Sequence, residues 1–392
     1  MKQIYFDNSA TTPLCDEAKA AMSAAMDCFG NPSSLHNMGV DAEKLVSDAR
    51  RAILASLGVR GVSKITEKQL IFTAGGTESD NLALLGVASA KNFPDGKKII
   101  ISDSEHPAIM SPAAELEKRG FTVVRIPTVG GAPDYEMLAH EADRNTILAS
   151  FMTVNNETGA VYDIKRISSI VKAANPDALM HTDCVQGYMK LPIGERLLGA
   201  DLITLSAHKI GGPKGVGALY VSADVQKRRA VAPIIFGGGQ ESGMRSGTEN
   251  VIGIAGFGAA VKASAGKISE YSERISSLRR YLISAITERG EFSEVRLNLP
   301  ENAAPHILSI TLPNIKSETA LHFLSRDGIY VSSGSACSSN TGHGSHVLRA
   351  FGLSDKAADC TIRVSLGAQN TKEEADIFLE SLKRAVGTLV RI

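Results

Sequence analysis

The chain has 392 residues, which is enough for two domains or for one large domain with an appendage. Hydrophobic residues make up 43% of it, ample for a sizeable core, and its 42 basic residues balance its 42 acidic ones. This balance, with a pI near 7.1, argues against nucleic acid or an anionic membrane as the main partner. No apolar run reaches the length of a bilayer and the first residues lack a signal-peptide centre, so we expect a soluble, cytoplasmic protein.

The five cysteines lie far apart and form no Cys-x-x-Cys pair. They are Cys15, Cys28, Cys184, Cys337 and Cys360. In a chain of this length such spacing is typical of free thiols rather than of a disulfide framework or a closed zinc site.

The first sixty residues predict a short strand and two helices. Residues 2–6 form the candidate strand, and a turn then leads into a helix over 13–29. A breaker at Asn-Pro-Ser-Ser precedes a second helix over 41–57, which Ser33 or Ser34 would cap.

Strand-like and helical segments alternate regularly from residue 70 onward. We predict strands at 70–73, 98–101, 121–126, 146–152, 178–181 and 202–205, with helices at 79–90, 107–119, 135–142 and 164–174. Such alternation implies a mostly parallel sheet covered on both faces. Functional residues of such sheets lie in the loops at the carboxyl ends of the strands.

The pattern changes after residue 255. An apolar stripe with a spacing of three or four residues predicts a long surface helix over 268–286. Strand-like pieces follow at 295–299, 306–312 and 361–366, and a final amphipathic helix covers 371–387. We interpret this part as a second, smaller α+β domain that begins near 255–265.

A lysine follows the predicted strand 202–205, in the stretch Ser206-Ala-His208-Lys209-Ile-Gly-Gly-Pro. Lys209 is either a surface lysine in a Gly-rich turn or an amine held at a pocket edge, where it would form a Schiff base with a carbonyl cofactor. The other strand-end loops distinguish the two interpretations.

Two of these loops suit a phosphate and a flat ring. After strand 70–73, Gly75, Gly76 and Thr77 open a helix whose free amides suit a phosphate, although a well-capped helix fits equally. After strand 98–101, His106 is either a satisfied histidine or a group that stacks on a ring or transfers a proton.

Two further loops offer amides and a carboxylate. Asn155 and Asn156 would hold a ring hydroxyl or a substrate carboxylate, or form an ordinary Asx turn. Asp183 would pair with a protonated pyridine nitrogen, or else form a salt bridge or a helix cap. Phosphate, ring face, hydroxyl, pyridine nitrogen and aldehyde together describe pyridoxal phosphate (PLP).

These motifs, in this order, resemble the fold-type I PLP enzymes, and within them the class V aminotransferase group. More narrowly, the chain is similar to the cysteine desulfurases of the nitrogen-fixation and housekeeping iron–sulfur type. The matching stretches are Tyr-Phe-Asp-Asn-Ser-Ala-Thr-Thr-Pro, Phe-Thr-Ala-Gly-Gly-Thr-Glu-Ser-Asp-Asn, Glu-His, Val-Asn-Asn-Glu, Asp-Cys-Val-Gln, Ser-Ala-His-Lys-Ile-Gly-Gly-Pro-Lys-Gly, Gly-Gly-Gly-Gln-Glu-Ser-Gly-Met-Arg-Ser-Gly-Thr and Ser-Ser-Gly-Ser-Ala-Cys.

The resemblance implies an α/β fold with a mostly parallel seven-stranded sheet in a large domain at 14–258, and a smaller α+β domain made of 1–13 and 259–392. It implies that Lys209 forms the Schiff base, Asp183 pairs with the pyridine nitrogen and His106 stacks on the ring. The remaining roles it implies are phosphate binding by Gly76, Thr77, Ser206 and His208, with Thr248 from the partner subunit of a homodimer; ring-hydroxyl contact by Gln186; and substrate-carboxylate binding by Asn156 and Arg363. Without the resemblance, Arg363 would be interpreted as a surface arginine on an edge strand.

Cys337 separates desulfurases from the aminotransferases of the same superfamily. It lies in a polar, Gly-rich loop, where a thiolate would attack the sulfur of bound L-cysteine and carry it away as a persulfide. The alternatives are an exposed structural thiol, or a metal site with His343 and His346. His106 would also take part in proton transfer during C–S cleavage.

The resemblance therefore implies conversion of L-cysteine to L-alanine, with sulfur passed to an acceptor such as an iron–sulfur scaffold. It leaves the acceptor open. A selenocysteine lyase or an aminotransferase is the rival within enzymes. A catalytically idle scaffold of the same fold is the rival outside them.

Overall fold

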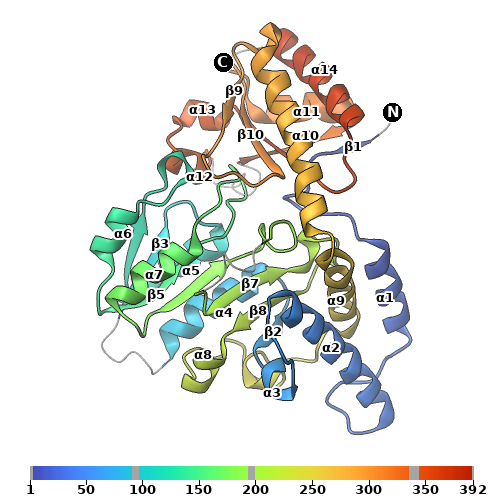
Figure 1. The fold of residues 1–392 in the computed structure, drawn as a ribbon, viewed down its shortest axis with the longest axis vertical. Helices are drawn as coiled ribbons and strands as arrows, with labels where there is room; N and C mark the ends of the chain where they lie inside the picture. The colour runs from blue at the N-terminus through green and yellow to red at the C-terminus, as the bar shows by residue number, and fades with distance from the viewer. Residues whose placement is uncertain (1–2, 91–96, 193–198, 335–343, 391–392) are drawn as a thin grey trace.

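The computed structural model describes residues 3–90, 97–192, 199–334 and 344–390 (Figure 1). At its centre is a seven-stranded sheet in the order β2-β8-β7-β6-β5-β3-β4. Its strands are β2 (Leu70–Thr73), β3 (Lys98–Ser102), β4 (Thr122–Ile126), β5 (Thr146–Ser150), β6 (Leu179–Asp183), β7 (Leu202–Ser206) and β8 (Gly217–Val221). All pairs are parallel except those of β8 with β2 and β7, so the predicted mostly parallel seven-stranded sheet is confirmed.

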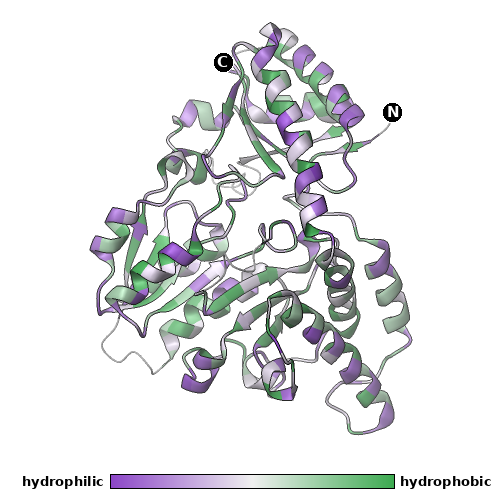
Figure 2. Cartoon of the chain, viewed as in Figure 1, coloured by the Kyte–Doolittle hydropathy of each residue, from purple (hydrophilic) through white to green (hydrophobic). Residues whose placement is uncertain are grey.

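Helices cover both faces of this sheet because its strands are apolar on both sides. In β3, Ile99 and Ile101 pack with one group of helices, while Ile100 packs with the other. The first face carries α4 (Gly76–Ser89), α5 (Pro107–Lys118) and α8 (Ala223–Arg228), and the second carries α2 (Asn37–Ser56), α6 (Tyr135–Glu141), α7 (Ile164–Ala174) and α9 (Val251–Ala265). Figure 2 shows the strands of the sheet as mainly hydrophobic and the surrounding helices as mixed.

The C-terminal part is built on a second, antiparallel sheet in the order β12-β13-β10-β9. Its strands are β9 (Arg296–Asn298), β10 (Ile307–Thr311), β12 (Ser332–Ser333) and β13 (Thr361–Ser365), and its main helices are α10 (Ile268–Glu288), α11 (Ser317–Arg326) and α14 (Lys372–Thr388). Near the N-terminus, β1 (Ile4–Tyr5) pairs with β11 (Ile329–Tyr330), so the first residues join this part. That pairing supports the division into 14–258 and 1–13 with 259–392, which stays a prediction.

Shorter elements complete the described chain. They are α1 (Asp16–Met26), α3 (Lys64–Glu67), α12 (His346–Ala350), α13 (Asp355–Asp359) and the 3-10 turns Val129–Gly131, Ala207–Lys209, Glu241–Gly243 and Gly290–Phe292. The prediction that Ser33 or Ser34 caps the second helix is wrong. That helix, α2, begins at Asn37, and the Nδ1 atom of His36 accepts from the backbone N–H of Gly39 at 3.3 Å.

The sequence analysis missed α9 because this helix is apolar all round and rich in glycine, so it shows no helical stripe. Its glycines let α1 and α2 approach closely. A Cβ atom on Gly256 would lie 2.6 Å from Met22, and one on Gly258 would lie 2.6 Å from Ala49. Within the described residues no single helix is long and apolar enough to cross a membrane; α9 and α10 meet that test only as a pair bent by 75°.

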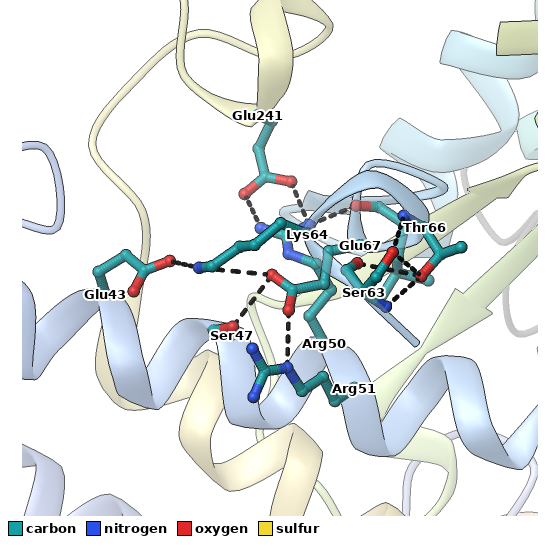
Figure 3. A network of polar contacts seen from close by, with 10 residues as sticks. Glu43, Ser47, Arg50, Arg51, Ser63, Lys64, Thr66, Glu67 and Glu241 are labelled. Carbon is teal, nitrogen blue, oxygen red and sulfur yellow. Dashed lines mark hydrogen bonds and ion pairs between the residues drawn. The ribbon is translucent and has the colours of Figure 1, made fainter. Parts of the chain in front are cut away.

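A network of charged side chains closes the outer edge of β2 (Figure 3). Arg50 on α2 donates to the carbonyl of Leu70 and makes two hydrogen bonds of 2.7 and 2.8 Å to Glu241. Glu241 in turn accepts from the backbone N–H of Phe72 at 2.9 Å. These bonds satisfy backbone groups that an open sheet edge would expose, and they fix the turn at Glu241 beside the strand that leads to Gly75.

Candidate active site

The predicted site residues that follow strands of the central sheet meet at one edge of it. Asp183 ends β6 and Ser206 ends β7, and these strands pair in parallel. His106 follows β3 and Asn156 follows β5, which pair with each other. Lys209 lies three residues beyond β7. The carboxyl ends of parallel strands therefore bring these residues into one region, as the alternation predicted.

Lys209 sits in a turn that the N-terminal segment crosses. Its Nζ atom donates to the carbonyls of Ser9 at 2.5 Å and Ala10 at 2.8 Å. The backbone N–H of Thr12 donates to the carbonyl of His208 at 2.9 Å. Lys209 is therefore not a solvent-facing lysine in a loose turn. Sequence reasoning gave Ser9 and Ala10 no role, although they lie in the first of the matching motifs.

The N-terminus of α4 forms the wall of a cavity of about 690 Å³. Gly76, Thr77, Ser206 and His208 all line it. Gly75, the residue before the helix, provides no side-chain cap, whereas Glu78 in the first turn accepts from the backbone N–H of Ala74 at 2.9 Å. The buried Oγ atom of Ser206 has no hydrogen-bond partner among the described residues.

This cavity fits a phosphate. First-turn amides and an unpartnered hydroxyl supply donors, and the helix dipole favours negative charge. A Cβ atom on Gly76 would lie 2.9 Å from Val185, so the glycine leaves room where a side chain would crowd the wall.

Asp183 is a buried carboxyl at the centre of the site. Burial raises its pKa to about 6, although the hydrogen bond from the backbone N–H of Val185 and the charge of Lys209 both lower it. The pKa of Asp80, also buried and beside it, is raised well above its usual value by burial and by the charge of Asp183. A buried carboxylate of this kind gains from a cationic partner, and a protonated pyridine nitrogen is one.

His106 is held as a neutral imidazole. Burial and the charge of Lys209 lower its pKa to about 4. Its Nδ1 atom accepts from the backbone N–H of Ala108 at 3.1 Å, at the start of α5. Because Nδ1 accepts, the ring proton is assigned to Nε2, which makes Nε2 the donor of this ring.

Of the two asparagines after β5, one forms an Asx turn and the other keeps its amide oxygen without a partner in the described chain. Asn155 forms the Asx turn, because its Oδ1 atom accepts from the backbone N–H groups of Glu157 and Thr158, both at 2.9 Å. The Oδ1 atom of Asn156 is buried and has no partner among the described residues. Only Asn156 therefore keeps its amide available for a ligand.

Arg363 joins this region from the second sheet. Its Nη1 atom donates to the carbonyl of Asn156 at 2.8 Å, and its Nη2 atom donates to Asp7 at 2.9 Å. Its Nε atom is buried without a partner in the described part of the chain. Since β13 lies between β10 and β12 and the residue is 7% exposed, the alternative of a surface arginine on an edge strand is wrong.

Gln186 is engaged at both ends of its amide. It donates to the carbonyl of Ser9 at 2.9 Å and accepts from the Nζ atom of Lys190 at 3.0 Å. Burial and the charges of Lys209 and Arg363 hold the pKa of Lys190 well below its usual range. Sequence reasoning missed Lys190; its signal was a lysine four residues after Gln186 in a stretch otherwise lacking charge.

Of the predicted residues that the structure describes, Thr248 does not join the others within this chain. Thr248 is exposed and does not line the cavity; its loop is tied to the start of α4 by the Arg245–Glu78 ion pair of 2.8 Å. Cys337 lies outside the described residues, as does His343.

The metal alternative stays a hypothesis, because Cys337 and His343 lie outside the described residues. His346 makes a 2.9 Å contact through Nε2 with the carbonyl of Glu105, and the described residues contain no cluster of three potential metal ligands.

Comparisons with known proteins agree with this geometry. The family model described as "Aminotransferase class-V" matches residues 4–378. The "Cysteine desulfurase IscS" of Dictyoglomus turgidum is 39% identical over 99% of this chain and 95% of that protein. The protein of the same name from Escherichia coli O139:H28 is 39% identical over 98% and 93%.

Solved structures agree as well. A "NIFS-LIKE PROTEIN" is 35% identical and superposes with a TM-score of 0.89 over 99% of this chain and 100% of that one. The chain thus belongs to the class V aminotransferases, a family of fold-type I PLP enzymes. Within that family it belongs to the IscS/NifS group of cysteine desulfurases.

Proposed function

We propose that this chain is a PLP-dependent cysteine desulfurase that converts L-cysteine to L-alanine and carries the sulfur as a persulfide on Cys337. The observation that carries the proposal is the set of buried polar atoms without partners around Lys209. The Oγ atom of Ser206, the Oδ1 atom of Asn156 and the Nε atom of Arg363 each lack a hydrogen bond within the described chain. Buried polar atoms in native proteins are nearly always paired, so these three fit a cofactor phosphate and a substrate carboxylate.

The cofactor, when bound, supplies an electron sink for the substrate α-carbon. Gly76, Thr77, Ser206 and His208 hold its phosphate, and Asp183 keeps its ring nitrogen protonated. Gln186 would contact the ring hydroxyl through the second hydrogen of its amide, and His106 would lie on the ring face. Lys209 would hold the cofactor, and its amine would move the proton at the substrate α-carbon.

Asn156 and Arg363 hold the substrate carboxylate, which turns the thiol of the bound cysteine toward Cys337. The thiolate of Cys337 attacks this sulfur, forming an S–S bond while the Cβ–S bond breaks. The electron pair of the broken bond stays on the carbon, which takes a proton and leaves as alanine. His106, neutral with its proton on Nε2, would supply this proton.

A homodimer completes the site in this proposal. Large apolar side chains are exposed on α1, α2, their connection and the segment before Glu241; they are Met26, Phe29, Leu35, Met38, Val40 and Phe236. A self-complementary contact would cover such a surface. Exposed Thr248, held by its loop to the start of α4, then reaches the phosphate of the partner subunit. We place the enzyme in the cytoplasm, with a thiol-bearing protein such as an iron–sulfur scaffold as acceptor.

The experiment measures both products. The PLP-loaded protein is incubated with L-cysteine and a thiol reductant, and alanine and sulfide are quantified together. We expect equal amounts from the wild type and, from Cys337→Ala, a loss of at least about a hundredfold with the cofactor absorbance retained. Cys28→Ala removes another half-exposed thiol and should keep full activity.

Pyruvate and ammonia in place of alanine would mean β-elimination and would overturn the proposal. Full turnover by Cys337→Ala would overturn the role of that thiol.

A further inference from the structure

Glu157 is a buried carboxyl that the mechanism above does not use. Its side chain is 8% exposed, and it follows Asn156 directly, beyond the end of β5. The Asx turn of Asn155 holds its backbone N–H at 2.9 Å, so its position is fixed from the large-domain side. Burial of a carboxyl costs free energy unless hydrogen bonds or a charged partner replace its lost hydration.

The carboxyl of Glu157 contacts both residues that flank the segment carrying Cys337. Its Oε2 atom accepts from the Oγ atom of Ser345 at 2.6 Å, eight residues after Cys337. The same oxygen lies against Gly334, three residues before Cys337, where any Cβ atom would collide with it. A Cβ atom on Gly334 would also lie 3.1 Å from Leu348 and 3.2 Å from Ser345, so a side chain at this position would displace the carboxyl of Glu157 and crowd these neighbours.

A second bond joins the same segment to the cofactor side of the site. His346, next to Ser345, contacts the carbonyl of Glu105 through Nε2 at 2.9 Å. Glu105 directly precedes His106. Each of these two bonds therefore ends one residue away from a group that contacts cofactor or substrate.

We propose that Glu157 is a positioning residue for sulfur transfer: its carboxyl holds Gly334 and Ser345, described residues on either side of Cys337 in the chain, next to the Asn156–Arg363 pair that binds the substrate carboxylate. This proposal rests on the proposed function. Its consequence is that substrate binding and delivery of the thiol share one anchor, because Arg363 holds the carbonyl of Asn156 at 2.8 Å. Burial raises the pKa of Glu157 to about 7, while the charge of Arg363 lowers it.

The test is a double-mutant cycle with Glu157→Gln and Ser345→Ala. Glutamine keeps the size of the side chain but removes the charge, and alanine removes the hydroxyl that donates to it. We expect each single variant to lower kcat about tenfold while KM for L-cysteine stays within about twofold, since charge-assisted hydrogen bonds have this strength. The double variant should be no slower than the slower single variant, because both changes remove one interaction.

Matched controls exist elsewhere in the chain. Glu67 is a buried carboxyl that accepts from Ser47 at 3.0 Å, far along the chain from the site (Figure 3). Glu67→Gln should leave kcat and KM unchanged whatever it does to thermal stability. Ser345 also caps α12, so Ser354→Ala, which removes the cap of the equally short α13, controls for that loss.

A further measurement does not depend on catalytic turnover. The rate at which iodoacetamide alkylates Cys337 should change at least about threefold in Glu157→Gln and Ser345→Ala, with Cys28 as the reference thiol in the same sample. Kinetic constants within twofold of wild type in both variants, with an unchanged alkylation rate of Cys337, would overturn the inference. So would a parallel rise in KM, which would assign Glu157 to substrate binding instead.

Failure of the proposed function has a different signature. A wild-type protein that forms no alanine refutes desulfuration, whereas the alkylation experiment still decides whether Glu157 positions Cys337.

Discussion

The cofactor side and the substrate side of this site are built in different ways. On the cofactor side, Asp183 and Ser206 end adjacent strands of one sheet, and Gly76 opens a helix that packs on that sheet. On the substrate side, Asn156 comes from the large sheet and Arg363 from the second sheet, 207 positions later. The first half is determined by local chain order, and the second by how two parts of the chain dock.

The two halves also differ in what they leave unsatisfied. On the cofactor side, burial disfavours the charged form of the Asp183 carboxyl, and the buried Oγ atom of Ser206 has no hydrogen-bond partner in the described chain. On the substrate side, Arg363 is already bonded to Asn156 and Asp7 and keeps only its Nε atom without a partner in the described chain. Removing one of these polar groups from the cofactor side should therefore not destabilise the cofactor-free protein. Changing Arg363 should weaken the contacts that hold the second sheet to Asn156 and Asp7.

The largest effect should come from Asp183→Asn. With the cofactor bound, activity should fall at least about a hundredfold because the amide cannot stabilise a protonated ring nitrogen. Without the cofactor, the variant should be more stable than wild type at pH 7.5, by on the order of 2 kcal/mol. Burial raises the folded-state pKa of Asp183 to about 6, so wild-type stability is lost as the pH rises from about 4 through 6.

Urea unfolding of the cofactor-free proteins between pH 4 and pH 8 measures this difference. The stability gap should close near pH 4. Asp201→Asn is the contrast, because Asp201 accepts from the backbone N–H of Met180 and pairs with Lys172; its loss should destabilise the protein. An Asp183→Asn variant no more stable than wild type at any pH would contradict the account of the cofactor side.

An intermediate effect is expected from Arg363→Lys. Lysine keeps the charge but cannot hold Asn156, Asp7 and a carboxylate at once, because it lacks the planar fork of arginine. We expect KM for L-cysteine to rise about tenfold to a hundredfold with a smaller change in kcat, measured by steady-state alanine formation. Arg279→Lys removes the bond from Nε to the carbonyl of Ile307 at 3.0 Å and should leave KM unchanged. Equal KM in Arg363→Lys and wild type would mean that the carboxylate binds elsewhere.

The smallest effect should come from Ser206→Ala. The affinity for PLP should fall about fivefold to tenfold, which is the net value of one hydrogen bond. The cofactor-free protein should lose no stability, since the Oγ atom has no partner to lose in the described chain. Fluorescence titration with PLP and thermal unfolding measure the two quantities. Ser168→Ala should lower the stability and leave the affinity for PLP unchanged, because the Oγ atom of Ser168 donates to the carbonyl of Gly199 at 2.8 Å, away from the cavity that fits the phosphate. A stability loss in Ser206→Ala would contradict the view that its hydroxyl has no partner in the cofactor-free protein.

Local pattern determined most of the part of the chain that is built on the seven-stranded sheet. Strand β2 was predicted at 70–73 and lies at Leu70–Thr73, and helix α7 was predicted at 164–174 and lies at Ile164–Ala174. Hydrophobic periodicity carries this information because a buried strand or an amphipathic helix shows its buried side within a few residues. Since parallel strands end at the same edge, the grouping of Asp183, His106 and Lys209 followed from the order of the elements alone.

Tertiary structure decided what local pattern does not encode. The interior place of Arg363 depends on β13 lying between β10 and β12. The resemblance had already assigned the substrate carboxylate to Asn156, and the structure adds a reason, because the Asx turn uses the amide oxygen of Asn155. The contacts of Glu157 with Gly334 and Ser345 join residues about 180 positions apart. Such contacts join segments far apart in the chain, and no periodicity within either segment records them, because a side chain's burial and partners are properties of the assembled structure.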